Sequence, residues 1–154
     1  EQAWQQLAKT IGCACFVFRL AGIYGPDRNA FVSLRAGKAR QIIKPDQVFG
    51  RIHRADISAA VWAAMNSNHT GGAFNLADDL PTPPQEVIKA AAAMLGMALP
   101  KAVPFDQADI SAMARSFYAE NKRVKNDKVK RELGLNLQYP SYKEGLAALL
   151  KDLT

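Results

Sequence analysis

A strand-like segment that ends in a glycine-containing turn is the first feature of this sequence that could do chemistry. Residues 13–20 are almost continuously apolar, and Gly22, Gly25 and Pro26 follow directly. Ligands of open α/β sheets bind at the carboxyl ends of strands, and glycine lets the backbone approach a ligand closely. The segment predicts a ligand contact there, although glycine–proline turns also end strands that bind nothing.

Two arginines near this turn could hold an anion. Arg28 lies just after the turn, and Arg51 follows in a second strand-like stretch, residues 48–53. A guanidinium group offers a planar fork to a carboxylate or phosphate. We take both as candidate contacts for an anionic substrate, and the alternative for each is a solvated surface arginine.

Two Tyr-x-x-x-Lys strings, from Tyr118 to Lys122 and from Tyr139 to Lys143, could indicate proton transfer. On a helix, such a lysine lies one turn from the phenol and lowers its pKa, so that the phenol can shuttle a proton. Pro140 interrupts helical continuity in the second string.

Other polar residues have simpler interpretations. We interpret His53 as a packed, hydrogen-bonded histidine rather than an acid or base, and Asp56 as the N-cap of a helix. Cys13 and Cys15 lack partners at metal-site spacing, so we interpret them as core residues and predict no metal site.

Helices and strands alternate around these residues. Apolar spacing and cap signals predict an amphipathic helix that ends at Gly12, and further helices over residues 29–36, 56–65, 83–95, 107–114, 126–133 and 141–153. Phe31 and Leu34 are expected to point inward, and Gly96 and Gly134 to end their helices. Thr82 with Gln85 and Ser141 with Glu144 have the spacing of capping boxes. Strands are predicted over residues 13–20, 39–43, 48–53 and 73–77, and the first is apolar enough to be buried on both faces of a parallel sheet. The alternation is typical of an α/β protein with elements drawn from a larger doubly wound sheet.

The first helix has no capping residue before it, so the helical pattern begins in mid-helix. We therefore expect the chain to be part of a longer protein. Its 154 residues, 49% hydrophobic and 22% charged, fit one soluble globular domain. The longest apolar stretch, residues 90–99, is shorter than the roughly 18 residues of a membrane span. No signal peptide is visible, so we expect a cytoplasmic location.

The net charge of +6 is concentrated in one segment, because six of the twenty bases lie between Lys122 and Arg131. Nucleic-acid binding would require stacking aromatic residues or a recognisable fold beside such a segment, and Phe117 and Tyr118 are the aromatics close to it. A solvated helix face is therefore favoured over a nucleic-acid contact. A basic binding module stays open as the alternative function.

Residues 19–26, Arg-Leu-Ala-Gly-Ile-Tyr-Gly-Pro, and residues 51–57, Arg-Ile-His-Arg-Ala-Asp-Ile, resemble a known family. They are similar to the carboxyl-terminal half of an extended short-chain dehydrogenase/reductase, of the NAD-dependent epimerase/dehydratase family. Residues 74–79 and 126–140 resemble the next strand and the closing helix and tail of that family. The resemblance implies the carboxyl-terminal part of a Rossmann-like doubly wound sheet, plus the small substrate-binding lobe, in a single truncated domain over residues 1–154.

The family's amino-terminal half carries the Gly-x-x-Gly-x-x-Gly phosphate loop and the catalytic Tyr-x-x-x-Lys pair. Neither has its counterpart here, because both Tyr-x-x-x-Lys strings lie far downstream of the family's position. The resemblance implies a missing half upstream of Glu1 and a parent protein that uses NAD or NADP. We expect no catalytic residue in this chain and no cofactor bound to it alone. The missing half and a second copy are the expected protein partners.

The resemblance also implies site residues. In the family, backbone groups just past the strand lie against the nicotinamide end of the cofactor, which implies cofactor contacts at Leu20, Ala21 and Ile23. Tyr24 joins Arg28 and Arg51 as an expected substrate contact.

Family members that act on nucleotide sugars usually have Asn at the position of Gly22 and Arg at the position of Phe49. Neither residue is present, which argues against a nucleotide-sugar substrate. The expected function is the substrate-binding portion of an NAD(P)-dependent epimerase, dehydratase or reductase. A free-standing interaction domain of the same ancestry is the further alternative.

Overall fold

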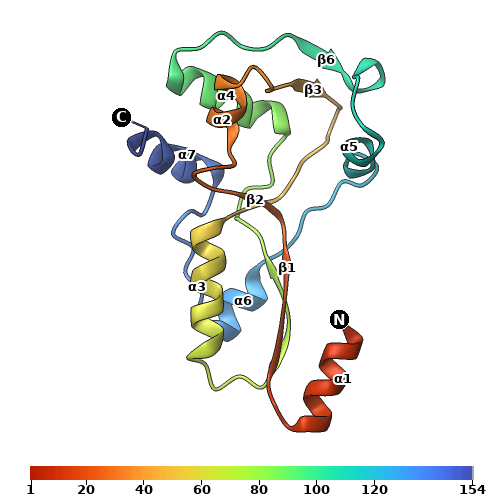
Figure 1. Ribbon diagram of the computed structural model, residues 1–154, viewed down its shortest axis with the longest axis vertical. Helices are drawn as coiled ribbons and strands as arrows, with labels where there is room; N and C mark the ends of the chain where they lie inside the picture. The colour runs from red at the N-terminus through yellow and green to blue at the C-terminus, as the bar shows by residue number, and fades with distance from the viewer. Residues whose placement is uncertain (154) are drawn as a thin grey trace.

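Three parallel strand pairs organise the chain, of which the computed structural model describes residues 1–153. β1 (Cys15–Leu20) pairs with β5 (Gly71–Leu76), with Leu20 opposite Leu76. β2 (Gly22–Tyr24) pairs with β4 (Arg51–His53), and β3 (Gln41–Ile43) pairs with β6 (Ala102–Pro104). β1 continues almost directly into β2, so this one stretch links the two ends of the molecule (Figure 1).

Seven α-helices and one 3₁₀ turn complete the described residues. They are α1 (Gln2–Ile11), α2 (Ala30–Arg35), α3 (Arg54–Met65), α4 (Pro84–Leu95), η1 (Phe105–Gln107), α5 (Ala112–Phe117), α6 (Asp127–Leu133) and α7 (Tyr142–Lys151). The predicted stops at Gly12, Gly96 and Gly134 are confirmed, because each adopts the left-handed conformation that ends a helix. Among residues 1–153, none of the helices combines the length and the apolar character needed to cross a membrane.

Two apolar cores hold the ends of the molecule. At the lower end in Figure 1, α3 and α6 pack on the β1–β5 pair around Phe74, Leu76 and Val129. At the upper end, α2, α4 and α7 enclose Phe31 and Leu146. The inward positions predicted for the helix over residues 29–36 are confirmed, because Phe31 and Leu34 are buried and Asn29 caps α2.

The helix that follows β4 begins differently from the prediction. His53 is its N-cap, with Nδ1 accepting a hydrogen bond from the Ala55 amide at 3.2 Å. The prediction that Asp56 is the cap is wrong, because this carboxylate is fully buried one turn further on. It accepts hydrogen bonds from the amides of Gln138 at 2.7 Å and Tyr139 at 3.2 Å. Asp56 therefore ties α3 to the segment before α7.

The two predicted capping boxes have different outcomes. Ser141 caps α7 and hydrogen-bonds the Glu144 carboxylate, as expected. Thr82 does not cap α4, because its backbone pairs with Phe49 and its hydroxyl donates to the Leu80 carbonyl at 2.7 Å. Pro83 takes the cap position instead, without a side-chain hydrogen bond.

The apolar segment at residues 13–20 is less buried than predicted. The prediction that it is buried on both faces of a sheet is wrong, because β5 is the one strand that pairs with β1 among the described residues. Cys13 is exposed and Cys15 half-buried, so the core interpretation of the cysteines is also wrong for Cys13. The predicted amphipathic helix exists as α1, but Trp4 and Ile11 are exposed on it.

Candidate functional site

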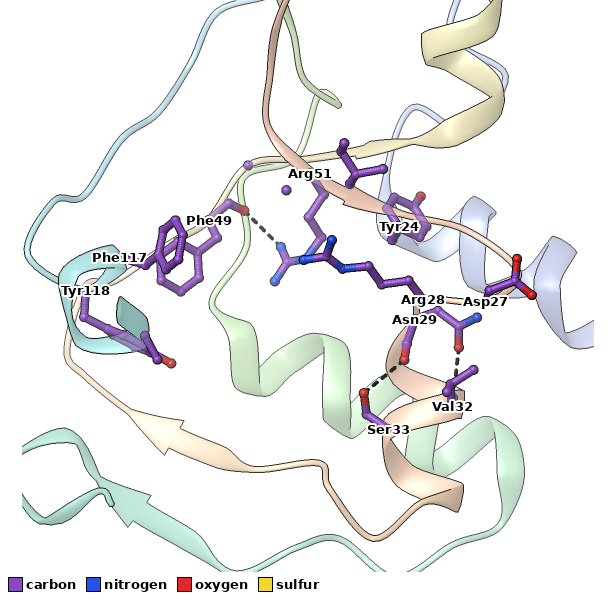
Figure 2. A pocket seen from close by; sticks show the side chains of 14 residues that line it. Tyr24, Asp27, Arg28, Asn29, Val32, Ser33, Phe49, Arg51, Phe117 and Tyr118 are labelled. Carbon is purple, nitrogen blue, oxygen red and sulfur yellow. Dashed lines mark hydrogen bonds between the residues drawn. The ribbon is translucent and has the colours of Figure 1, made fainter. Parts of the chain in front are cut away.

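A pocket of about 610 Å³ opens beside β2, at the end of the molecule where α2 begins (Figure 2). Four segments line it: residues 22–24, residues 27–33 in part, residues 49–51, and residues 114–118 in part. We call it the arginine pocket, because Arg28 and Arg51 both extend into it. It lies at the carboxyl end of β2, where ligands of parallel sheets bind.

Arg51 is held by backbone carbonyls. Its Nη1 donates hydrogen bonds to the carbonyls of Phe49 at 2.9 Å and Thr82 at 3.2 Å. These two carbonyls lie close together because Phe49 and Thr82 form an antiparallel backbone bridge. Burial lowers the pKa of Arg51, and the negative charge of Asp78 counteracts that effect. The guanidinium is thus fixed at the pocket wall, with one edge anchored.

Arg28 reaches the same space from the opposite side. Its backbone closes the turn after β2 through reciprocal hydrogen bonds with Gly25, at 3.0 and 3.1 Å. Its side chain then extends toward the Arg51 guanidinium (Figure 2). A Cβ atom on Gly25 would lie 2.9 Å from Cδ of Arg54, so a larger residue there would displace the Arg54 side chain.

No carboxylate of residues 1–153 forms an ion pair with either guanidinium. Asp27 lines the pocket, but its carboxylate pairs with Arg54 at 3.2 Å. Two like charges that face one cavity repel each other, and an anion between them removes that repulsion. The arrangement suits a carboxylate or phosphate group.

Aromatic rings form much of the remaining wall. Phe49 packs edge-to-face on Tyr118 at 5.1 Å between ring centroids, and Phe117 lies beside them with 65% of its surface exposed (Figure 2). Tyr24 is buried, and its hydroxyl donates to the Ser141 carbonyl at 3.4 Å. Burial raises the pKa of Tyr24, and the nearby charges of Asp78 and Asp56 raise it further, so Tyr24 stays neutral at pH 7.

The structure brings together Ile23, Tyr24, Arg28 and Arg51 of the predicted site residues. The other two, Leu20 and Ala21, line two adjoining hollows of about 510 and 540 Å³. The smaller hollow shares Phe49, Gly50 and Phe117 with the arginine pocket. The predicted cofactor and substrate contacts therefore lie along one continuous band of the surface.

Phe117 and Tyr118 line the arginine pocket, although the sequence did not predict them as site residues. The predicted helix over residues 107–114 placed them beyond a helix end, next to the basic segment. In the structure the helix is shifted, since α5 covers Ala112–Phe117 and Tyr118 is its C-cap. The available signal was two adjacent aromatic residues beside the basic segment.

His53 is buried between two tyrosine rings, at 5.0 Å from Tyr24 and 4.0 Å from Tyr139. Its Nε2 has no hydrogen-bond partner, and burial lowers the pKa of the ring. The interpretation as a packed histidine is confirmed. Neither Tyr-x-x-x-Lys string lies on one helix, because Tyr118 ends α5 and Tyr139 precedes the cap of α7.

The basic segment is largely neutralised. Four of its six bases have acidic neighbours: Lys122 pairs with Glu120, Lys130 with Asp79, and Lys128 and Arg131 both lie near Glu132. Lys128, Lys130 and Arg131 lie on α6, where exposed ion pairs are typical of a solvated helix face. Lys122, Arg123 and Lys125 precede that helix, so the predicted helix face is wrong for this half of the segment.

No protein-family model matches the sequence, and no curated protein matches it. Solved structures do. A functionally unknown conserved protein from Silicibacter pomeroyi DSS is 54% identical, with a TM-score of 0.83, over 90% of this chain and 48% of that one. RMD from Pseudomonas aeruginosa, solved with NADPH, is 17% identical, with a TM-score of 0.72, over 98% of this chain and 51% of its own. The human epimerase family protein SDR39U1, also solved with NADPH, is 20% identical, with a TM-score of 0.73, over 89% and 48%.

This chain spans about half the length of each of these structures. The likeness confirms the predicted fold class: the chain is an α/β protein whose parallel strands and helices match part of a Rossmann-like fold.

Proposed function

We propose that this chain is the substrate-binding part of an NAD(P)-dependent epimerase, dehydratase or reductase of the extended short-chain dehydrogenase/reductase family. The observation that carries the proposal is the convergence of Arg28 and Arg51 on one pocket, where no carboxylate of residues 1–153 forms an ion pair with either. The pocket adjoins the strand end at which the predicted cofactor contacts Leu20 and Ala21 lie. An anionic substrate would bind to the two guanidiniums, with its body along the band toward Ala21.

The residues at the strand end fit one end of a dinucleotide. Leu20 and Ile23 are 43% and 39% exposed, and exposed apolar side chains suit a flat nicotinamide ring. When bound, NAD or NADP supplies hydride transfer. The family holds the cofactor's phosphates with a Gly-x-x-Gly-x-x-Gly turn at a helix amino terminus, and the glycines of this sequence never have that spacing. An amino-terminal half would supply that turn and the proton-transfer pair.

Calorimetric titration of this chain with inorganic phosphate and with acetate tests the anion site. We expect weak, saturable binding, with a Kd on the order of millimolar, as befits one or two charge-assisted contacts. Arg28→Gln and Arg51→Gln should each weaken it about fivefold or more, corresponding to about 1 kcal/mol. Arg35→Gln, an exposed charge on α2 outside the pocket, is the matched control. Equal binding by all three variants and the original chain would refute the anion site.

A further inference from the structure

The polar side chains at the amino terminus of α2 already form hydrogen bonds within the chain. Asn29 caps the helix, with Oδ1 accepting from the Val32 amide at 3.0 Å. Its Nδ2 donates to the carbonyls of Gly25 at 2.8 Å and Pro26 at 2.9 Å. The Ser33 hydroxyl donates to the Asn29 carbonyl at 3.2 Å (Figure 2). These groups hold the turn and the helix together, so their donors are not available to a ligand.

The other polar lining groups are also committed, with few exceptions. The Tyr24 hydroxyl is directed to Ser141, and the Asp27 carboxylate is directed to Arg54. Among the described side chains that line the arginine pocket, the two guanidiniums, the Tyr118 hydroxyl and the second carboxylate oxygen of Asp27 are left to bind a ligand. A sugar presents several hydroxyl groups, and most of them would lose their hydrogen bonds to water without replacement.

The rest of the lining is apolar and exposed. Val32 is 43% exposed and Ile23 39%, and they face the cavity together with the rings of Phe49 and Phe117. Figure 2 shows both phenylalanine rings on the side of the pocket away from Arg28. Flat apolar surfaces of this kind bind flat apolar groups and gain nothing from hydroxyls.

We infer that the arginine pocket takes an organic anion with one carboxylate or phosphate and a flat apolar body, and that Phe117 selects for that body. This inference rests on the proposed function, because it assigns a substrate class to the same site. The anionic group lies between Arg28 and Arg51, and the body lies against Phe49 and Phe117. Sugars are rejected because the pocket offers too few hydrogen-bonding groups for their hydroxyls.

Three probes separate the contribution of the anionic group to binding from that of the flat apolar body. 2-Naphthoate carries a carboxylate and a flat apolar body, 2-naphthylmethanol carries the body without the charge, and glucuronate carries the charge on a hydroxylated body. Binding of each to this chain is measured by calorimetry or by NMR shifts. We expect 2-naphthoate to bind about tenfold more tightly than either of the others.

Variants locate the binding. Phe117→Ser should weaken 2-naphthoate binding about fivefold and leave glucuronate binding unchanged, because the ring is lost and the charges remain. Met113→Ser is the matched control, since Met113 is 73% exposed on the same helix and does not line the pocket. Arg51→Gln should weaken the binding of both carboxylates.

The outcomes distinguish this inference from the proposed function. If glucuronate binds as tightly as 2-naphthoate, or if Phe117→Ser and Met113→Ser behave alike, the substrate class is wrong while the anion site stands. If Arg51→Gln leaves carboxylate binding unchanged, or if 2-naphthylmethanol binds as tightly as 2-naphthoate, the anion site itself is wrong.

Discussion

At the residue scale, the proposed anion site depends on the two guanidinium groups of Arg28 and Arg51. Arg51 is anchored by the Phe49 and Thr82 carbonyls, so its free edge keeps one orientation toward Arg28. Pre-positioned donors lose little freedom when an anion arrives, which raises affinity without further contacts. Burial also disfavours the charged form of a nearby carboxylate, Asp78.

Asp78 is 2% exposed, and neither carboxylate oxygen has a hydrogen-bond partner. Burial raises its pKa from 3.8 to about 6, although the charge of Arg51 opposes the rise. The folded protein therefore holds this proton more tightly than the unfolded chain does. It follows that the free energy of unfolding decreases as the pH rises from about 4 to about 6, by roughly 1 to 3 kcal/mol from this group.

We predict that Asp78→Asn removes this decrease and leaves the protein more stable than the original chain at pH 7 by roughly 1 to 3 kcal/mol. Urea denaturation at a series of pH values measures it. Asp106→Asn, at an exposed position, serves as the control. An unchanged pH dependence in Asp78→Asn would show that the carboxylate is ionised at no cost in the folded state.

At the scale of elements, the contact between β2 and α7 joins the arginine pocket to the upper core. Gly145 lies in the first half of α7 and is buried against Tyr24. A Cβ atom at this position would lie 2.6 Å from Cε2 of Tyr24 and would also collide with its hydroxyl. The absence of a side chain at residue 145 thus lets the helix approach the strand end.

We predict that Gly145→Ala destabilises the protein by roughly 1 to 3 kcal/mol, because the tyrosine ring must move. Glycine-to-alanine changes inside helices normally stabilise by up to about 1 kcal/mol, so the sign is diagnostic. Thermal unfolding measures the effect. In a Tyr24→Ala background, where the ring is absent, Gly145→Ala should destabilise the protein less than it does in the original chain. A Gly145→Ala protein that is more stable than the original chain would contradict this packing.

Local patterns predicted the elements well where a local cause fixes them. Asn29 caps α2 and Gly96 ends α4, because capping and the left-handed turn depend on neighbouring residues. The role of Asp56 could not be predicted, since its hydrogen-bond partners lie more than eighty residues away. Phe117 was missed for a similar reason: its place in the pocket depends on how α5 meets β4.

The molecule as a whole leaves apolar surface uncovered at the end opposite the pocket. β1 pairs with β5 along one edge, and on α1 the side chains of Trp4, Leu7 and Ile11 are 70%, 49% and 64% exposed. Two-stranded parallel sheets are rarely stable alone, because parallel sheets are usually covered on both faces. A further strand and a covering layer would stabilise this end.

We predict that the chain self-associates through this surface when nothing else covers it. Sedimentation velocity at rising concentration should show dimers or larger species. Trp4→Glu together with Ile11→Glu should shift the chain toward monomer, whereas Val61→Glu, on the exposed side of α3, is the control. A monomer at every concentration that also binds no hydrophobic dye would contradict the prediction.

We propose that this chain binds the substrate and that an amino-terminal half binds the cofactor. Titration of NADPH and NAD, followed by calorimetry, with this chain alone and with the longer protein that joins it to such a half, tests the claim most directly. We predict micromolar binding by the longer protein, and binding weaker than about millimolar by this chain alone, because it lacks the phosphate-binding turn. Micromolar binding of either dinucleotide to this chain alone would contradict the account.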